Sequence, residues 1–385
     1  MTPHGLHAVA ADYVFDGCTK HQNVAVVIEG SEIKCVQPQP ELSAELPTRH
    51  LPTGAWLAPG FIDLQVNGGG DVLFNNSPTP EAIITIAAAH RRFGTTAVLP
   101  TFISDTREKM RGAMAAAQQA IERDPSVLGI HLEGPFLSPE KAGVHEVDLM
   151  RVPDEIDLEI LCGQWQGELL ITLAPERVPK GFIAKLVETG GRVALGHSMA
   201  TYEETCSAMA EGLSGFTHLF NAMRPLQSRE PGPIAAALES PTARYGLIVD
   251  GWHVNPAMLR LALRGCGQPM LVTDAMPPVG GRESAFHLYG REIRVVGGRC
   301  LRADGTLAGA ALDMVGAVRN CVNLLQVSLP DALQFASRNP AEFIGLGHML
   351  GRLAPGYRAD MVAIDPNPIA VLETWVAGVS EVAAP

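Results

Sequence analysis

Four short segments of this chain each end an expected β-strand with a side chain that can bind a metal ion or transfer a proton. In chain order they are HLEGPF (131–136), ALGHS (194–198), FTHLFNAM (216–223) and LVTDAM (271–276). They bring Glu133, His197, His218 and Asp274 from four separate strands. A carboxylate and two imidazoles suit a divalent ion such as Zn²⁺ with one position open for water. An aspartate facing that water can take its proton, so the pattern predicts a metallohydrolase.

A further histidine, His131, precedes Glu133 by two residues and therefore lies on the same face of its strand. A single histidine in a protein is more often a packed or solvated group than a metal ligand. We therefore expect His131 to support the metal ligands or to pack beneath them, and we do not count it as a ligand.

The span from residue 58 to residue 349 alternates expected strands with expected helices, which is the order of a (β/α)8 barrel. The expected strands are 61–66, 96–100, 128–133, 169–173, 193–197, 215–218, 245–249 and 270–273. The expected helices are 80–93, 107–123, 179–189, 201–211, 256–264 and 311–327. Several of them begin with Thr or Pro, which are favoured at helix N-termini. A barrel would bring the four chemical side chains together, because the ends of all eight parallel strands converge at its mouth.

Both ends of the chain contain short segments that are typical of strands. These segments are 24–28, 32–36 and 360–364. We expect residues 1–57 and 350–385 to pair into one small β-sandwich domain. The barrel domain, residues 58–349, would then be inserted between the two parts.

The last crossover of the barrel is interrupted by residues 279–309, which are rich in Gly and Arg. This composition predicts a loop and a β-hairpin before the final helix. Gly280 and Gly281 precede the hairpin and suit a mobile lid over the barrel mouth.

Composition and charge narrow the class of protein. The chain has 385 residues, of which 46% are hydrophobic and 18% charged, as is ordinary for a globular enzyme. The formal charge of −12 argues against nucleic acid or an anionic membrane as a partner. No apolar stretch reaches the ~20 residues of a membrane span, and we expect no signal peptide. The seven scattered cysteines form no C-x-x-C pair and predict reduced thiols in a cytoplasmic protein.

The first expected barrel strand extends the pattern, since residues 59–68 read PGFIDLQVNG. Further specific motifs are HLEGPF, TDAM (273–276), and FNAM (220–223) followed by REPG (229–232). On these motifs, and over nearly its whole length, the chain resembles the amidohydrolase superfamily and within it the N-acetylglucosamine-6-phosphate deacetylases. The resemblance implies a barrel enzyme of amino-sugar catabolism. Its reaction would be metal-dependent hydrolysis of N-acetyl-D-glucosamine 6-phosphate to glucosamine 6-phosphate and acetate.

Gln65 and Asn67 depart from a pattern that many superfamily members share. Those members carry His-x-His at the end of this strand, where it holds a second metal ion. An amide is a poor metal ligand beside an imidazole, so the resemblance to the branch with this substitution implies one divalent ion per subunit. We expect zinc, with Fe²⁺, Co²⁺ or Mn²⁺ as alternatives. Gln65 would contact the ion through a water molecule or be only a polar residue of the barrel mouth.

The resemblance also implies roles for residues around the ion. The residue matching Asp274 takes a proton from the metal-bound water and later gives it to the leaving amine. The residue matching His145 helps to polarise the amide carbonyl, and Val144 beside it is expected to contact the substrate. His253 in DGWH (250–253) matches a residue that contacts the sugar phosphate. Without the resemblance, His145 and His253 could equally be solvated loop residues, and Asp274 could cap the segment that follows it.

An acidic chain that binds a phosphorylated sugar needs a local cation. Arg229 is the best candidate because a guanidinium can donate two parallel hydrogen bonds to phosphate, although a loop arginine beside Glu230 is usually a surface ion pair. The resemblance implies Asn221 and the backbone of Ala222 as further phosphate contacts, and Leu307 as part of the sugar site. The matching arginine of the family reaches into the partner's active site. We therefore expect a homodimer in which Arg229 serves the partner subunit.

Three alternatives remain open. Two of them keep the chemistry: deacetylation of the galactosamine epimer's 6-phosphate, and hydrolysis of a cyclic amide by another amidohydrolase. Cyclic-amide enzymes commonly use two metal ions, so Gln65 and Asn67 count against them, whereas the epimer is distinguished only by the shape of the pocket. The third alternative is a non-catalytic sugar-phosphate sensor, against which the presence of Glu133, both metal histidines and Asp274 argues.

Overall fold

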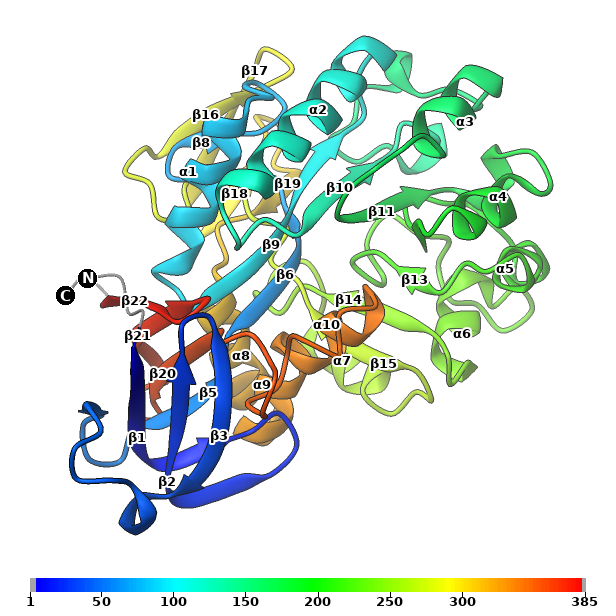
Figure 1. The fold of residues 1–385 in the computed structure, drawn as a ribbon. Helices are drawn as coiled ribbons and strands as arrows, with labels where there is room; N and C mark the ends of the chain where they lie inside the picture. Colours follow the sequence, from blue (N-terminus) through cyan, green and yellow to red (C-terminus); the bar gives the residue numbers. More distant parts are fainter. Residues whose placement is uncertain (1–4, 383–385) are drawn as a thin grey trace.

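Eight parallel strands form a barrel at the centre of the molecule in the computed structural model, which describes residues 5–382. In their hydrogen-bonded order they are β6 (Phe61–Val66), β9 (Thr95–Ile103), β10 (Gly129–Glu133), β11 (Glu168–Leu173), β12 (Arg192–Leu195), β13 (Gly215–Phe216), β14 (Arg244–Leu247) and β15 (Gln268–Leu271). After β15, the backbone N–H of Asp274 donates to the carbonyl oxygen of Gln65 at 3.0 Å, and Ala275 pairs with Val66. The last strand position therefore closes onto the first, and the expected (β/α)8 barrel is confirmed (Figure 1).

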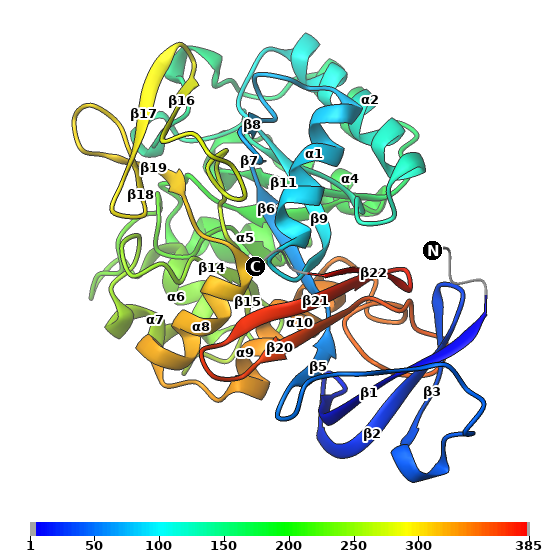
Figure 2. The same cartoon turned by 90° about the vertical axis from the view of Figure 1, so that its left-hand side faces the viewer.

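The α-helices of the described chain lie around the outside of this barrel (Figures 1 and 2). They are α1 (Pro80–Arg91), α2 (Arg107–Arg123), α3 (Glu155–Leu161), α4 (Phe182–Glu188), α5 (Tyr202–Ala210), α6 (Gly232–Glu239), α7 (Pro256–Ala262), α8 (Met314–Leu325), α9 (Leu329–Ala336) and α10 (Arg338–Phe343). The hydroxyls of Thr79, Thr106 and Thr201 accept hydrogen bonds from the first turns of α1, α2 and α5, which explains where these helices begin. The sequence pattern does not predict α3, α6, α9 or α10.

The two ends of the chain form one sheet beside the barrel (blue and red in Figure 1). Its strands are β1 (Leu6–Phe15), β2 (Lys20–Glu29), β3 (Glu32–Pro38), β4 (Thr48–His50), β5 (Trp56–Pro59), β20 (Met361–Asp365), β21 (Ala370–Val376) and β22 (Val379–Val382). Strand β5 joins the two ends, because it pairs with both β1 and β20. Ile28, Leu57 and Met361 belong to one hydrophobic cluster, so the sheet folds around a core of its own. The domain boundaries stay a prediction, and residues 1–4 and 383–385 lie outside the described residues.

A four-stranded antiparallel sheet, here called the mouth sheet, stands where the sequence predicts a loop and one hairpin (yellow in Figure 2). Its strands are β16 (Ala285–Leu288), β17 (Arg291–Val296), β18 (Arg299–Leu301) and β19 (Leu307–Ala310). The N–H of Ala310 donates to the Asp274 carbonyl oxygen at 2.9 Å, which fixes β19 beside the end of the eighth barrel strand. Leu288 of this sheet shares a hydrophobic cluster with Ile103 and Met276 of the barrel loops. The mouth sheet is therefore packed onto the mouth of the barrel.

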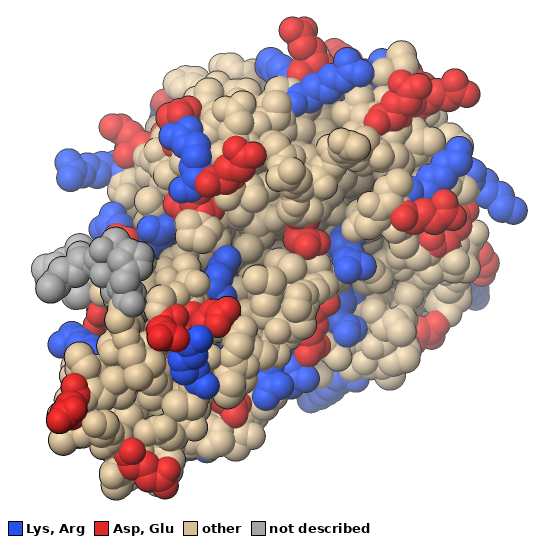
Figure 3. All heavy atoms as spheres, in the orientation of Figure 1, with Lys and Arg blue, Asp and Glu red and all other residues tan. Residues whose placement is uncertain are grey.

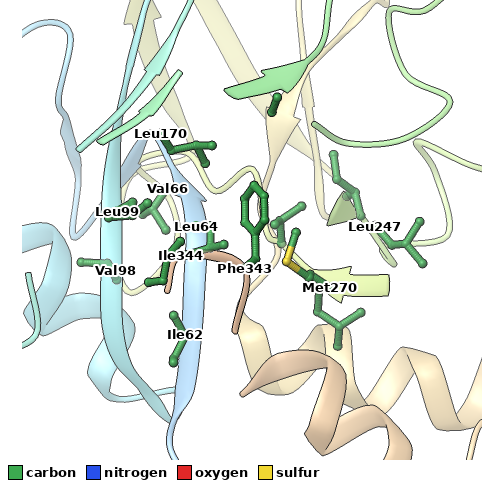
Figure 4. Packing of buried hydrophobic residues seen from close by; sticks show 14 of the residues in the cluster. Ile62, Leu64, Val66, Val98, Leu99, Leu170, Leu247, Met270, Phe343 and Ile344 are labelled. Atoms are coloured by element: carbon green, nitrogen blue, oxygen red, sulfur yellow. The ribbon is translucent and has the colours of Figure 1, made fainter. Parts of the chain in front are cut away.

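Apolar side chains fill the interior of the barrel away from its mouth. Figure 4 shows Phe343 of α10 beside Leu64 and Met270 in this packing. A Cβ atom at Gly215 would lie 2.7 Å from Cζ of Phe343, so β13 needs a glycine where it passes the ring. This plug leaves the opposite end of the barrel for polar chemistry.

Acidic and basic side chains are mixed on the face of the molecule that Figure 3 shows. With a formal charge of −12, that face offers no broad positive field to an anion. A phosphorylated ligand would have to be held by particular local groups. Within residues 5–382, no helix is both long and apolar enough to cross a membrane.

Candidate active site

Glu133, His197 and His218 converge at the barrel mouth. Glu133 is the last residue of β10, and the two histidines lie just beyond the ends of β12 and β13. Oε1 of Glu133 lies 3.0 Å from Nε2 of His218 and 3.2 Å from Nε2 of His197, and the two Nε2 atoms are 3.1 Å apart. All three side chains are buried, and together they form a group that could hold a metal ion.

The spacing and orientation of these donors fit a divalent ion. Donors at ~2.1 Å from a tetrahedral ion lie about 3.4 Å from one another, a few tenths of an ångström more than the separations among Glu133, His197 and His218. Nδ1 of His197 lies 2.7 Å from the carbonyl oxygen of Lys141, to which only an N–H can donate. This contact fixes the ring so that Nε2, the atom that would bind the ion, faces Glu133 and His218.

The backbone is strained at this centre. The φ angle is +48° at His197, +31° at His218 and +52° at Asp274, a region that residues other than glycine rarely adopt. Of the eleven non-glycine residues with positive φ in the described chain, five are His197, His218, Phe220, Ala222 and Asp274. Such strain persists only where the surrounding structure fixes it, and it concentrates at functional sites.

Asp274 is oriented by two amide side chains from the end of β6. Nδ2 of Asn67 donates to Oδ1 of Asp274 at 2.7 Å, and Nε2 of Gln65 donates to the same oxygen at 3.2 Å. Gln65 Nε2 also lies 3.3 Å and 3.4 Å from the two carboxylate oxygens of Glu133. Gln65 therefore connects Asp274 directly to an expected metal ligand, and its contact with the ion through water stays a prediction.

Burial sets the protonation of the carboxylates in this centre. Burial raises the pKa of Asp274 to about 6, and the nearby Glu133 carboxylate adds to the effect. Burial also acts to raise the pKa of Glu133, but hydrogen bonds with His197 and His218 hold it well below its ordinary value. Glu133 is thus the permanent anion, whereas Asp274 can gain and lose a proton near neutral pH.

His131 lies inside the barrel in a chain of hydrogen bonds that crosses several strands. Its Nδ1 is 3.1 Å from the hydroxyl of Thr101 and its Nε2 is 2.7 Å from the hydroxyl of Thr172, which lies 2.5 Å from that of Thr217. Both ring nitrogens are engaged by hydroxyl groups, which agrees with a supporting role rather than with metal binding.

His145 is held by Ser104. Nδ1 of His145 lies 3.3 Å from the Ser104 backbone N–H and 2.8 Å from its hydroxyl oxygen. Because a backbone N–H can only donate, Nδ1 must be unprotonated, and the neutral ring carries its proton on Nε2. Burial, followed by the charge on His197, lowers the pKa of His145 to about 3. The ring is therefore neutral near pH 7 and can donate a hydrogen bond from Nε2.

A cavity of about 310 Å³ opens at these residues, within the range of small-ligand sites. Besides the metal ligands and Asp274, its walls include Val144, His145, Asn221, Ala222, His253 and Leu307, which the sequence predicts to bind substrate. His253 is fixed by Asp250, whose Oδ2 lies 2.6 Å from Nδ1 of the ring. Arg229 does not line this cavity in the single chain and is exposed on the loop before α6.

Two residues near the centre, Glu176 and Ser104, have no role that the sequence pattern predicts. The carboxylate of Glu176 accepts hydrogen bonds from the Ser198 hydroxyl at 2.7 Å and from the Met199 N–H at 2.5 Å, so it holds the segment directly after His197. The position of Glu176 after β11 is the one signal that the sequence contains. Ser104 follows β9 in the same way, but its link to His145 depends on tertiary contact.

Comparisons with known proteins agree with this geometry. Residues 56–382 match the amidohydrolase family. The chain is 43% identical to the N-acetylgalactosamine-6-phosphate deacetylase of Shewanella sp. (strain ANA-3), over 88% of this chain and 86% of that protein. It is 34% identical to the N-acetylglucosamine-6-phosphate deacetylase of Haemophilus influenzae, over 90% of this chain and 92% of that protein.

The crystal structure of N-acetylglucosamine-6-phosphate deacetylase from Pasteurella multocida is similar over 98% of this chain and 100% of its own. The TM-score is 0.95 at 34% sequence identity. The resemblance seen in the sequence is therefore confirmed over both the barrel and the sheet formed by the chain ends. The chain belongs to the amidohydrolase family, in the branch of the amino-sugar-6-phosphate deacetylases.

Proposed function

We propose that the protein hydrolyses the N-acetyl group of N-acetyl-D-glucosamine 6-phosphate, an amino-sugar catabolic reaction that releases glucosamine 6-phosphate and acetate. The observation that carries the proposal is the buried cluster of Glu133, His197 and His218 beside Asp274 at one cavity. In this reaction water adds to the amide carbonyl carbon and the C–N bond breaks. One water proton ends on the leaving nitrogen.

The residues of the centre have complementary tasks. A divalent ion held by Glu133, His197 and His218 would polarise the amide carbonyl and acidify a water molecule. Asp274 takes a proton from that water and returns it to the amine, without an acyl-enzyme. Both orienting amides donate to its Oδ1, which leaves Oδ2 for this exchange. His145 donates from Nε2 to the carbonyl oxygen, where negative charge develops.

One ion per chain, most simply zinc, is part of this proposal. Gln65 and Asn67 stand where a second ion would need imidazole ligands, and their amide groups already bind Asp274 and Glu133. Two imidazoles and one carboxylate are a usual catalytic zinc set with an open fourth position. Fe²⁺, Co²⁺ and Mn²⁺ are the alternatives for the same three ligands.

The phosphate end of the substrate is assigned to His253, Asn221 and the backbone of Ala222. These three residues line the cavity and supply an imidazole, an amide and backbone groups, while Val144 and Leu307, also in its walls, are assigned to the rest of the sugar. Among the described residues that line the cavity there is no lysine or arginine. A dianionic phosphate would therefore lack a permanent cation if the single chain were the whole site.

A homodimer would complete the phosphate site. Arg229 is exposed on the loop before α6, and Glu230 beside it is held by the N–H groups of Tyr202 and Gly232 at 2.9 Å and 3.0 Å. The fixed Glu230 gives the loop a defined shape, from which Arg229 can reach a partner subunit. We place Arg229 in the partner's cavity, where it forms two hydrogen bonds with the phosphate.

The galactosamine epimer is a second candidate substrate, because the Shewanella relative that acts on N-acetylgalactosamine 6-phosphate is 43% identical to this chain. We favour the glucosamine epimer because that name is carried by the Haemophilus relative and by the Pasteurella structure, which matches this chain at a TM-score of 0.95. Both epimers present the same N-acetyl group to the metal ligands and Asp274. Only a comparison of rates therefore separates the two substrates.

The working location that we propose is the cytoplasm. All seven cysteines lie within the described residues and are free, which supports a reducing compartment. A non-catalytic sensor is the remaining alternative outside enzymes. It would bind the phosphosugar without the need for the oriented Asp274.

An acetate-release assay tests the proposal. Purified protein, loaded with zinc, is supplied in parallel with the 6-phosphates of N-acetylglucosamine and N-acetylgalactosamine. We expect acetate and free amine in equal amounts from both, with the larger kcat/KM for the glucosamine epimer. A larger kcat/KM for the galactosamine epimer would make N-acetylgalactosamine 6-phosphate the preferred substrate instead. Binding of both sugars without acetate would establish the sensor instead.

A further inference from the structure

The mouth sheet contacts the loop that carries His145 at two of its basic residues. Arg302 follows β18, and its two terminal nitrogens donate to the carbonyl oxygens of Gly143 at 3.3 Å and Val144 at 3.0 Å. Arg291 of β17 forms an ion pair with Glu146 at 3.1 Å. The residues immediately before and after His145 are thus held by the mouth sheet.

A third contact reaches His145 from its other side. The hydroxyl of Tyr289, in the turn between β16 and β17, donates to the backbone carbonyl oxygen of Ser104. Ser104 in turn holds Nδ1 of His145 through its N–H and its hydroxyl. Tyr289, Ser104 and His145 therefore form a continuous hydrogen-bonded chain from the mouth sheet to the cavity.

The turn that carries Tyr289 is an unusual place for an aromatic residue. Tyr289 and Gly290 are the two residues between paired strands, with φ of +50° and +75°. A two-residue turn of this kind needs positive φ at both positions, and it favours Asn, Asp or Gly at the first. A tyrosine there is strained. The strain indicates that its side chain makes a contact that Asn, Asp or Gly could not make.

The ring of Tyr289 has a packing role that must be separated from the role of its hydroxyl. The ring packs against the cluster that contains Leu288, Ile103 and Met276. Phenylalanine would keep this packing. Only the hydroxyl reaches Ser104, so the Tyr289→Phe substitution isolates the hydrogen-bonded chain from the apolar contact.

We propose that Tyr289 is a positioning residue for His145, and that the mouth sheet presents the imidazole to the substrate carbonyl through Tyr289 and Ser104. The inference rests on the proposed function, because His145 matters only if an amide carbonyl is polarised there. The same sheet lines the cavity with Thr306, Leu307 and Gly309. Substrate contact and the orientation of His145 therefore depend on one structural unit.

The chain offers a matched control for the hydroxyl. Tyr357 donates to the carbonyl oxygen of Gly347 at 2.9 Å, away from the cavity-lining residues. Single-turnover acetate release, KM and melting temperature are measured for Tyr289→Phe and Tyr357→Phe. We expect the rate for Tyr289→Phe to fall about tenfold with KM within about twofold, because a small displacement of a reacting group is costly. Tyr357→Phe should leave both within about twofold.

A double-mutant cycle with His145→Ala distinguishes a positioning role of Tyr289 from a general loss of stability. If Tyr289 acts through His145, adding Tyr289→Phe to His145→Ala should cost no further rate. An equal tenfold loss in both backgrounds would overturn the proposal, as would an unchanged rate for Tyr289→Phe in an active wild-type enzyme. An inactive wild type would contradict the proposed function instead.

Arg302→Lys provides a second test if Tyr289→Phe folds poorly. It keeps the charge but loses the planar group that spans two carbonyl oxygens. The control is Arg319→Lys, since Arg319 donates twice to the Ile369 carbonyl oxygen, at 2.9 Å and 3.1 Å, outside the cavity. We expect a lower rate only for Arg302→Lys, and this loss should also vanish in the His145→Ala background. Equal losses for both lysine variants would contradict the proposal.

Discussion

The metal side of the cavity is built from buried side chains that one chain fixes in place, whereas the phosphate side is built from loops and has no lysine or arginine among the described lining residues. Glu133, His197 and His218 lie at strand ends, and Asp274 is held by two amide donors. Arg229, the expected phosphate ligand, is exposed on a loop. The groups that bind the metal ion and transfer protons need exact placement, which the barrel strands provide. A cation that binds phosphate needs less exact placement and can come from a loop of another subunit.

The largest effect should follow removal of the metal ion. Without it the three donors keep their places but cannot polarise the carbonyl, so chelation should abolish acetate release. It should also lower the melting temperature, because binding at a thousandfold excess over Kd stabilises by about 4 kcal/mol. Elemental analysis of the restored enzyme should find about one ion per chain. Two tightly bound ions, both required for activity, would contradict a metal side in which Gln65 and Asn67 replace ligands.

Asp274→Asn should produce the next largest loss. The amide keeps the size of the side chain but cannot take a proton, so kcat should fall by about 10²–10⁴ with binding retained. Single-turnover acetate release and phosphosugar binding measure the two effects separately. A variant that keeps more than about a tenth of the wild-type rate, where chemistry limits, would remove Asp274 from the role of general base.

Arg229→Ala should sharpen the contrast between the two sides. Loss of a charged hydrogen-bonding partner of roughly 1.5–3 kcal/mol should lower kcat/KM for the phosphorylated sugar about 10–150-fold. The unphosphorylated sugar should be affected much less, because it has no phosphate to bind. The matched control is Arg224→Ala in the same loop, since Arg224 donates to backbone carbonyl oxygens of Met199 and Ala200 and should not distinguish the two sugars.

The smallest effect on the reaction concerns Asp63, which is buried in β6 and has no part in the proposed chemistry. Burial raises its pKa from 3.8 to about 7, and its carboxylate accepts from the Thr273 hydroxyl at 2.5 Å. The folded state therefore holds a proton that the unfolded state loses. Stability that is fully present below pH 3.8 should decline as the pH rises to about 7.

Thermal unfolding of Asp63→Asn and the wild type between pH 5 and 8 tests the direction of this pH dependence. The neutral amide lacks the titration, so its melting temperature should fall less than that of the wild type as the pH rises. The expected difference in slope is on the order of 1 kcal/mol per pH unit below pH 7. Parallel melting curves for the two proteins would show that Asp63 does not titrate in this range.

The sequence predicts the metal side well because its signals are local. Glu133, His197 and His218 each follow a short apolar strand, and parallel barrel strands bring such positions together. The barrel itself follows from alternating strands and helices. Helices α3 and α6, of 7 and 8 residues, are missed although the equally short α4 and α7 are predicted, so a periodic pattern does not decide at this length.

The mouth sheet could not be predicted in full for a different reason. Residues 279–309 lack a regular alternation of apolar and polar residues, and the sheet depends on a few buried side chains such as Leu288 and Cys300. The contact between Tyr289 and Ser104 joins positions 185 residues apart, so no local pattern contains it. The role of Arg229 cannot be read from one chain, because its expected ligand lies in another subunit.

Mixed dimers test the contrast between the two sides most directly. An Asp274→Asn chain and an Arg229→Ala chain, each nearly inactive on the phosphosugar alone, are mixed under conditions in which subunit exchange is demonstrated. If Arg229 serves the partner, each mixed dimer contains one intact site and one site with both defects, so a 1:1 mixture should recover about a quarter of wild-type activity. No recovery despite exchange, or an active enzyme that is monomeric, would contradict the shared phosphate site.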